Sequence, residues 1–218
     1  MRSGALAIGL VLLLGSSEAA SSTSTPTYRS AVPSGNRPVM LIFHPGAFVF
    51  GSASQMGAAR AAARNEGFKP IAVEYENLRG GLRQSKHLAR RYEHYGHPVY
   101  AYGESAGGTF AGVLAKRGFA RAAALYDPPT NLMHQRWAGF IPPRLRRRVS
   151  LDRGPTKSPI LAIASKRDAV VGSKDTRRWA RRDPHVRLAL EPGGHLDQAD
   201  YPQALRRSMR YLARRARK

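Results

Sequence analysis

A serine flanked by glycines lies in the middle of the chain, in the run Gly103-Glu104-Ser105-Ala106-Gly107-Gly108. The pattern G-x-S-x-G between an apolar segment and a helix-compatible segment is typical of a nucleophile elbow, a strand-to-helix turn too tight for side chains at Gly103 and Gly107. A hydroxyl presented there, beside a helix amino terminus, can attack a carbonyl carbon. The alternative is a glycine-rich turn that only packs a helix on a strand. A phosphate-binding loop is disfavoured, because neither G-x-G-x-x-G nor a G-K-[ST] ending is present.

A serine hydroxyl needs a base to take its proton, and the base needs an acid to orient it. His195 follows the apolar run 186–190, and Asp168 follows the apolar run 159–164. The order Ser, Asp, His along the chain is expected of a sheet whose site is built from successive strand ends. Ser105, Asp168 and His195 are therefore the predicted catalytic residues.

Each of these assignments has an alternative. A loop histidine is often only a surface residue, and Asp168 could cap a helix that begins near Ser173. Asp127 is the competing acid, since it follows the apolar run 122–126, one strand earlier. We favour Asp168, because Pro128-Pro129 behind Asp127 indicate a turn.

An acyl-transfer site also needs hydrogen-bond donors for the developing oxyanion. The loop His44-Pro45-Gly46-Ala47-Phe48 follows the apolar run 39–43, where its backbone N–H groups can point to the same place. Gly46 and Ala47 are the predicted donors from this loop, and Ala106 is the predicted donor from the elbow. The alternative is an ordinary strand-to-helix turn. We expect no metal and no cofactor, since no carboxylate shares the spacing of His87, His94 and His97.

The elements that must position these residues alternate along the chain. Six apolar runs have the length of strands: 39–43, 70–73, 98–102, 122–126, 159–164 and 186–190. Five segments between or after them are compatible with helices: 55–65, 82–95, 106–116, 173–182 and 202–217. Strands that are apolar without strict alternation predict burial on both faces. The predicted fold is α/β, a doubly wound, mostly parallel sheet of about six strands with helices on both faces.

The composition excludes several classes of protein. With no cysteine, the chain has no disulfide, no thiol nucleophile and no Cys-ligated zinc. The 36 Lys and Arg against 14 Asp and Glu give a formal net charge of +22. That charge has two interpretations: a coding bias toward arginine, or non-specific contact with an anionic cell-surface polymer or lipid. No specific nucleic-acid partner is expected.

The amino terminus has the features of a targeting segment. Arg2 precedes a ten-residue apolar run at 5–14, and small residues follow it. This pattern predicts a signal peptide over 1–19 and a secreted, periplasmic or cell-envelope protein. A membrane anchor is the less favoured alternative, because a spanning helix needs roughly 20 apolar residues. The Ser/Thr/Pro-rich segment 20–38 is the predicted flexible lead-in to a domain over 39–218, with a cap-like excursion at 127–155.

These motifs resemble the α/β-hydrolase superfamily, and within it the carboxylesterase and lipase group related to hormone-sensitive lipase. That group carries an H-G-G-G-[FWY] loop, a V-x-Y-R-L strand end and a G-[DE]-S-A-G-G elbow. Their counterparts here are His44-Pro45-Gly46-Ala47-Phe48, Val73-Glu74-Tyr75-Glu76-Asn77 and Gly103 to Gly108. The elbow matches fully, whereas Pro45 and Ala47 replace glycines in the first loop. The resemblance implies a compact esterase.

The leading functional hypothesis is a secreted serine hydrolase that cleaves small-molecule or lipid carboxylic esters through an acyl-enzyme. A peptidase or an acyltransferase on the same fold is the second hypothesis. The third is a weakly active hydrolase-like scaffold that binds anionic surfaces.

Overall fold

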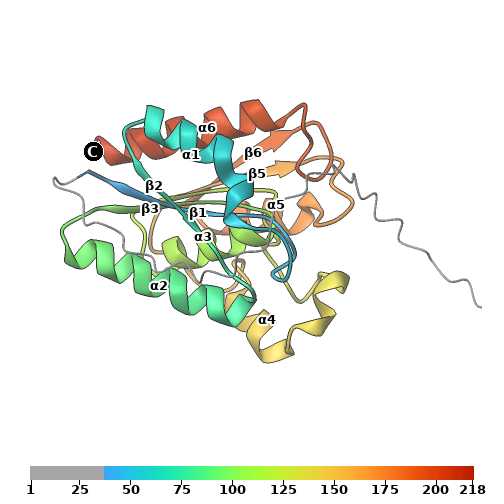
Figure 1. The fold of residues 1–218 in the computed structure, drawn as a ribbon. Coiled ribbons are helices and arrows are strands. Elements are labelled where there is room, and N and C mark those ends of the chain that lie inside the picture. Colours follow the sequence, from blue (N-terminus) through green and yellow to red (C-terminus); the bar gives the residue numbers. More distant parts are fainter. Residues whose placement is uncertain (1–36) are drawn as a thin grey trace, which may run out of the picture. The chain divides into compact units, whose positions relative to one another are not determined.

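The computed structural model describes residues 37–218, which form six strands and six α-helices (Figure 1). The predicted signal peptide over 1–19 and nearly all of the lead-in over 20–38 lie outside the described residues. Among the helices of the described part, none is long and apolar enough to cross a membrane.

One parallel sheet organises the molecule. Its strands are β1 (Val39–Phe43), β2 (Lys69–Val73), β3 (Val99–Glu104), β4 (Ala123–Tyr126), β5 (Ile160–Ser165) and β6 (Val186–Glu191). They lie in the order β2-β1-β3-β4-β5-β6, and every neighbouring pair is parallel. The chain moves outward from β1 to β2 and then returns to β3 on the other side of β1. Such a switch point opens a crevice at the carboxyl ends of the strands, between β1 and β3.

Helices cover both faces of this sheet. The helices α1 (Gly57–Asn65) and α6 (Tyr201–Ala216) cover one face, and α2 (Leu78–His94) and α3 (Ala106–Lys116) cover the other (Figure 1). The helix α5 (Ser173–Arg182) packs on the α2 and α3 side through Trp179. The predicted fold class is therefore confirmed.

Burial on two faces explains why the central strands of the sheet are largely apolar. Along β1, Leu41 and Phe43 belong to the core under α2 and α3, whereas Met40 and Ile42 belong to the core under α1 and α6. All five β1 residues are fully buried. The result is a pair of cores separated by the sheet, with the carboxyl strand ends held rigidly between them.

Two segments differ from the sequence-based expectation. Helix α2 begins at Leu78, four residues before the predicted start, although it contains Gly80 and Gly81. The Asn77 side chain accepts a hydrogen bond from the Gly80 N–H at 2.8 Å and caps the helix. A side chain at Gly81 would meet the Phe110 ring at 2.7 Å, so close helix packing requires this glycine.

The excursion over 127–155 contains a short 3₁₀ helix, Arg136–Phe140, and the helix α4 (Pro143–Val149). Its apolar residues Leu132, Ala138, Val149 and Leu151 are buried in the core under α2 and α3. The segment therefore contributes to that core and does not only lie over it.

Candidate active site

The turn between β3 and α3 holds Ser105 in a strained conformation. Its φ is 49° and its ψ is −122°, a region that residues with side chains rarely occupy. A side chain at Gly103 would lie 2.2 Å from the Gly107 carbonyl oxygen, and one at Gly107 would lie 2.3 Å from the Phe43 carbonyl oxygen. Both elbow glycines are thus required by close backbone contacts, and the turn presents Ser105 at the crevice between β1 and β3.

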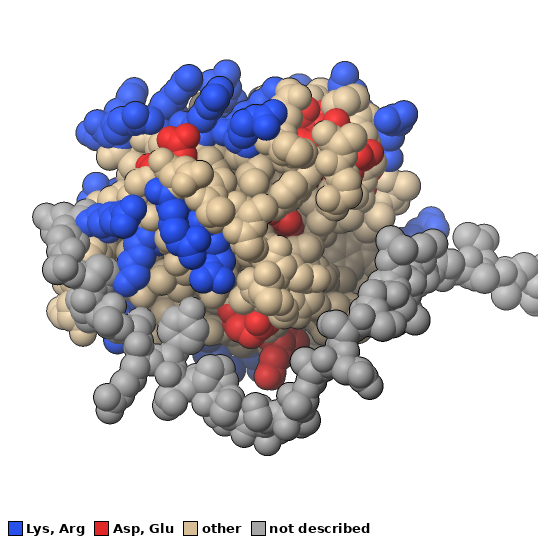
Figure 2. Space-filling model, turned by 45° about the horizontal axis from the view of Figure 1, so that its top comes forward, with Lys and Arg blue, Asp and Glu red and all other residues tan. Residues whose placement is uncertain are grey.

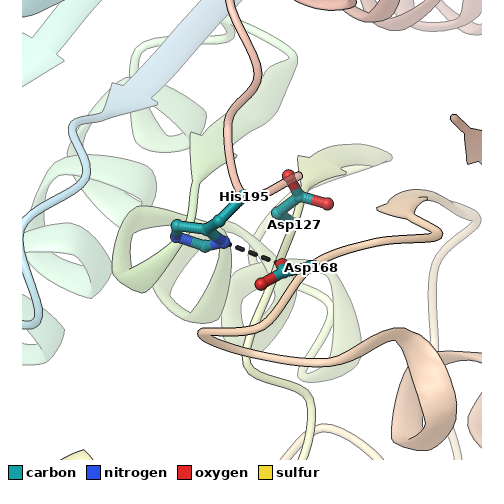
Figure 3. Close-up of side chains that lie close together, drawn as sticks. All are labelled: Asp127, Asp168 and His195. Carbon is teal, nitrogen blue, oxygen red and sulfur yellow. Dashed lines mark hydrogen bonds and ion pairs between the residues drawn. The ribbon is translucent and has the colours of Figure 1, made fainter. Parts of the chain in front are cut away.

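Three of the sequence-predicted residues come together at this edge of the sheet. The Nε2 atom of His195 lies 2.9 Å from the Ser105 Oγ atom. Its Nδ1 atom lies 2.8 Å from the Asp168 Oδ2 atom, the contact that Figure 3 marks with a dashed line. Burial raises the pKa of Asp168, but the hydrogen bonds from His195 and from two backbone amides outweigh burial and lower it overall. The Asp168 carboxylate therefore stays charged and can stabilise an imidazolium on His195.

Asp168 is held by its own loop and does not cap α5. Its Oδ1 atom accepts hydrogen bonds from the Val170 and Val171 N–H groups, both at 2.8 Å. The helix α5 begins only at Ser173, after Gly172. The acid loop is also tied to the histidine loop, because the Arg167 N–H donates to the Gly193 carbonyl oxygen at 2.9 Å.

Asp127, the competing acid, binds other groups. Its carboxylate accepts hydrogen bonds from the Ser165 N–H at 2.7 Å, the Ser165 hydroxyl at 2.9 Å and the Leu196 N–H at 2.8 Å. It is almost fully buried, and burial raises its pKa. Asp127 thus joins the end of β5 to the residue after His195, while Asp168 contacts the imidazole (Figure 3).

A divalent metal does not fit this cluster well. One ligand atom each of Asp127, Asp168 and His195 lies within 4.8 Å of the others. However, N–H and O–H donors already occupy the two carboxylates, and the imidazole bridges Asp168 and Ser105. Asp168, His195 and Ser105 are instead joined to one another by hydrogen bonds.

The predicted oxyanion donors come from the two turns that follow β1 and β3. Gly46 has a φ of 127°, and a side chain there would collide with the Phe50 carbonyl oxygen at 1.9 Å. The Gly46 carbonyl oxygen accepts from the N–H groups of Val49 and Phe50, which folds the loop into a compact turn. Within residues 37–218, the Gly46 and Ala47 N–H groups donate to no protein acceptor. The Ala106 N–H opens α3, so it has no acceptor within the helix and can also donate to an anion.

Two residues that directly follow β2 support this loop, a role that sequence reasoning missed. The Tyr75 hydroxyl donates to the His44 carbonyl oxygen, and the two rings stack with centroids 4.0 Å apart. Glu74 lies 3.3 Å from the buried His44 Nε2 atom and accepts from the Ala53 N–H. The Val-x-Tyr strand end was the available signal, but only the structure shows that it contacts the β1 loop.

No protein-family model matches the chain, and no curated protein matches its sequence. Among solved structures, esterase 2 of Thermogutta terrifontis has a TM-score of 0.71 at 17% identity, over 85% of this chain and 86% of that one. The fold of this chain matches that of solved α/β-hydrolase structures.

Two further structures agree with this α/β-hydrolase fold. An esterase of Pyrobaculum calidifontis has a TM-score of 0.62 at 20% identity, over 84% of this chain and 76% of that one. A bifunctional acetyl ester and xyloside hydrolase of Caldicellulosiruptor lactoaceticus has a TM-score of 0.68 at 15% identity, over 84% of each chain. The structural neighbours are esterases, but none singles out the group related to hormone-sensitive lipase, which stays a prediction.

Ala47 stands in the β1 loop where the H-G-G-G-[FWY] motif has a glycine, and this difference leads to a stability prediction. Ala47 has a φ of 52°, where an L side chain costs about 1 kcal/mol. We expect Ala47→Gly to raise the free energy of unfolding by about 0.5–1 kcal/mol and to leave kcat within roughly threefold, because the N–H donor is kept. Denaturant unfolding and ester turnover measure the two effects.

The control is the same substitution at Ala61, an exposed position inside α1. There glycine should lower the free energy of unfolding by about 1 kcal/mol, since the helix loses propensity. A destabilised Ala47→Gly variant would contradict the assigned strain.

A buried acid lies next to the nucleophile. The Glu104 Oε1 atom accepts hydrogen bonds from the hydroxyls of Tyr102 and Tyr201, each at 2.8 Å. Burial raises the pKa of Glu104 above its ordinary value of 4.5, and the two hydroxyls only partly oppose this shift. The cluster joins the elbow to the first residue of α6, and neither partner of Glu104 was singled out in the sequence.

This raised pKa predicts a pH-dependent effect of Glu104→Gln. An acid whose pKa is raised on folding favours the folded state below its unfolded pKa and loses that contribution as pH rises through its folded pKa. The variant should therefore gain stability relative to the wild type as pH rises above about 4.5. Thermal unfolding from pH 4 to pH 8 measures this difference. The exposed Glu76→Gln is the control, and a flat difference for Glu104→Gln would refute the prediction.

Proposed function

We propose that this protein hydrolyses carboxylic esters through an acyl-enzyme on Ser105. The observation that carries the proposal is the continuous relay in which His195 lies 2.9 Å from the Ser105 Oγ atom and 2.8 Å from Asp168. In the first step, the Ser105 oxygen bonds to the ester carbonyl carbon while His195 Nε2 takes the hydroxyl proton. His195 then gives that proton to the departing alkoxide, and Ser105 is left acylated.

Deacylation repeats the step with water. His195 takes a proton from the attacking water, and the bond between Ser105 and the acyl group breaks as the proton returns to the serine oxygen. The N–H groups of Gly46, Ala47 and Ala106 bind the oxyanion of both tetrahedral intermediates. Asp168 remains a carboxylate throughout and orients the imidazole.

Apolar side chains around the carboxyl edge support an apolar acyl group as the substrate. Val49 and Phe50 of the β1 loop, Phe140 of the excursion and Val170 of the acid loop are all exposed large hydrophobic residues. T. terrifontis esterase 2 has been solved with bound butyrate and with bound propionate. We therefore propose esters of short apolar acids as the first substrates to test.

The test compares an ester and an amide of the same acid. We expect turnover of p-nitrophenyl butyrate, little or no turnover of butyryl p-nitroanilide, and covalent labelling of Ser105 by a fluorophosphonate. Preferred cleavage of the anilide would favour a peptidase, and acyl transfer to an added alcohol in place of water would favour an acyltransferase. Absence of both turnover and labelling would refute the proposal.

Export is part of the proposal, on the basis of the predicted signal peptide over 1–19. Amino-terminal sequencing of protein recovered outside the cytoplasm should show cleavage after Ala19.

A further inference from the structure

A basic groove lies between α6 and β6, away from the strand ends that carry Ser105. Its volume is about 730 Å³, and seven of its twelve lining residues are Arg or Lys, with no acidic residue among them. Lys and Arg side chains gather along the upper edge of the molecule in Figure 2, the side on which α6 lies in Figure 1.

Three of these residues form a row along the helix. Arg206, Arg210 and Arg214 are spaced four residues apart on α6, so they share one face and succeed one another at about 6 Å. All three are exposed, and within residues 37–218 none of their guanidinium groups has a hydrogen bond or ion pair. Neighbouring Arg207, in contrast, lies 3.0 Å from Glu191.

Such a row is unfavourable for the protein alone. Like charges four residues apart destabilise a helix by a few tenths of a kcal/mol per pair. No acidic residue follows Asp200 in the chain, so α6 itself offers nothing to neutralise them. A bound anion with several regularly placed charges would remove this repulsion.

The shape and chemistry of the groove favour a phosphate polymer over a membrane. Membrane-surface helices bury large apolar side chains in the bilayer. The exposed large hydrophobic residues of the described part lie at Val49, Phe50, Tyr95, Phe140 and Val170, and none lies on α6 or β6. The guanidinium fork suits bidentate contact with phosphate. The ring of Tyr211, which lines the groove, adds an apolar surface beside the cations.

We propose that the groove between α6 and β6 binds a linear phosphodiester polymer, with Arg206, Arg210 and Arg214 each contacting a phosphate. Binding is independent of sequence, because the contacts are to the backbone of the polymer. It tethers the protein without changing the site at Ser105, so it holds whether or not the proposed ester hydrolysis is correct.

The test uses a fluorescent 12-nucleotide oligothymidylate and the full folded domain. Fluorescence anisotropy at ~50 mM to ~200 mM salt gives the affinity and its salt dependence. In the variant Arg206→Gln, Arg210→Gln, Arg214→Gln, we expect at least a roughly tenfold loss of affinity at ~50 mM salt. The slope of log K against log salt should become shallower by about 2, or ~0.7 for each lost contact with a single strand.

The matched control removes three exposed arginines from a second basic groove, of about 460 Å³, between α2 and α4. Arg79→Gln, Arg83→Gln, Arg144→Gln lowers the net charge equally, so it should retain the wild-type slope within ~0.5. Turnover of p-nitrophenyl butyrate, if the wild type shows it, should be unchanged in both variants. The thermal midpoint should fall in neither, and in the α6 variant it should rise slightly because the repulsion between its arginines is removed. If the first triple variant fails to fold, Arg210→Gln alone should reduce the slope by ~0.7.

Several outcomes would overturn the proposal. Equal losses of oligonucleotide affinity in the two triple variants would mean that only net charge matters. Absence of binding by the wild type at ~50 mM salt would show that the groove is not a binding site. An unchanged slope of log K against log salt in Arg210→Gln would also overturn the proposal. If the α6 variant loses affinity for phosphatidylglycerol vesicles but not for the oligonucleotide, the occupant is a membrane surface.

Discussion

Ser105→Ala is expected to lower turnover of p-nitrophenyl butyrate by about 10⁴-fold or more and to abolish fluorophosphonate labelling. The relay from Asp168 through His195 ends on the Ser105 Oγ atom, so the variant keeps only substrate binding and the oxyanion donors. Steady-state kinetics and mass spectrometry of the labelled peptide measure the two losses. The thermal midpoint should not fall, because alanine at this strained turn removes only one hydroxyl.

A matched control is available in Ser208, a buried serine of α6 whose hydroxyl has no hydrogen-bond partner among the described residues. Ser208→Ala should leave turnover and labelling within about twofold of the wild type. Undiminished labelling of Ser105→Ala would show that another residue is the nucleophile and would remove the basis of the proposed function.

Asp168→Asn is expected to lower kcat by roughly 10³- to 10⁴-fold. The amide cannot hold the imidazole in the tautomer that accepts a proton from Ser105, nor stabilise the imidazolium that forms. Asp168 also carries a lowered pKa, so its charge should persist to a pH below the usual range of an aspartate. In the variant, KM should change far less than kcat, because Asp168 lies behind His195 and not in the substrate crevice.

Comparison with Asp127→Asn shows which of the two acids acts on His195 and which one only holds the loops together. Asp127→Asn keeps one carbonyl acceptor but places an amide N–H₂ against the Ser165 or Leu196 donors. We expect a loss of unfolding free energy of about 1–3 kcal/mol and a fall in kcat much smaller than that of Asp168→Asn. The reverse order of kcat losses would assign the acid to Asp127.

Much of this architecture follows from local sequence. The four central strands, β1, β3, β4 and β5, are largely apolar runs buried along their whole length. Every strand is followed by a loop and then a helix, so the parallel α/β sheet is predictable from alternation alone. The elbow is local only in part. The contact that excludes a side chain at Gly103 lies within one strand-turn-helix unit, whereas the contact that excludes one at Gly107 is with Phe43 of β1. The candidate serine, acid and histidine could be named from local sequence, since each lies within four residues of the end of a strand.

Only the tertiary structure decided how these strand ends meet. Asp127 and Asp168 follow neighbouring strands, and the conformations of two separate loops determine that Asp168 contacts His195 while Asp127 binds Ser165 and Leu196. Contacts between distant segments were also invisible in the sequence, such as Tyr201 with Glu104 across 97 residues. The basic groove was also invisible in the sequence, because α6 forms one wall of it only by packing beside β6. Local pattern encodes which elements form, whereas side-chain contacts across loops depend on the packed arrangement of the whole sheet.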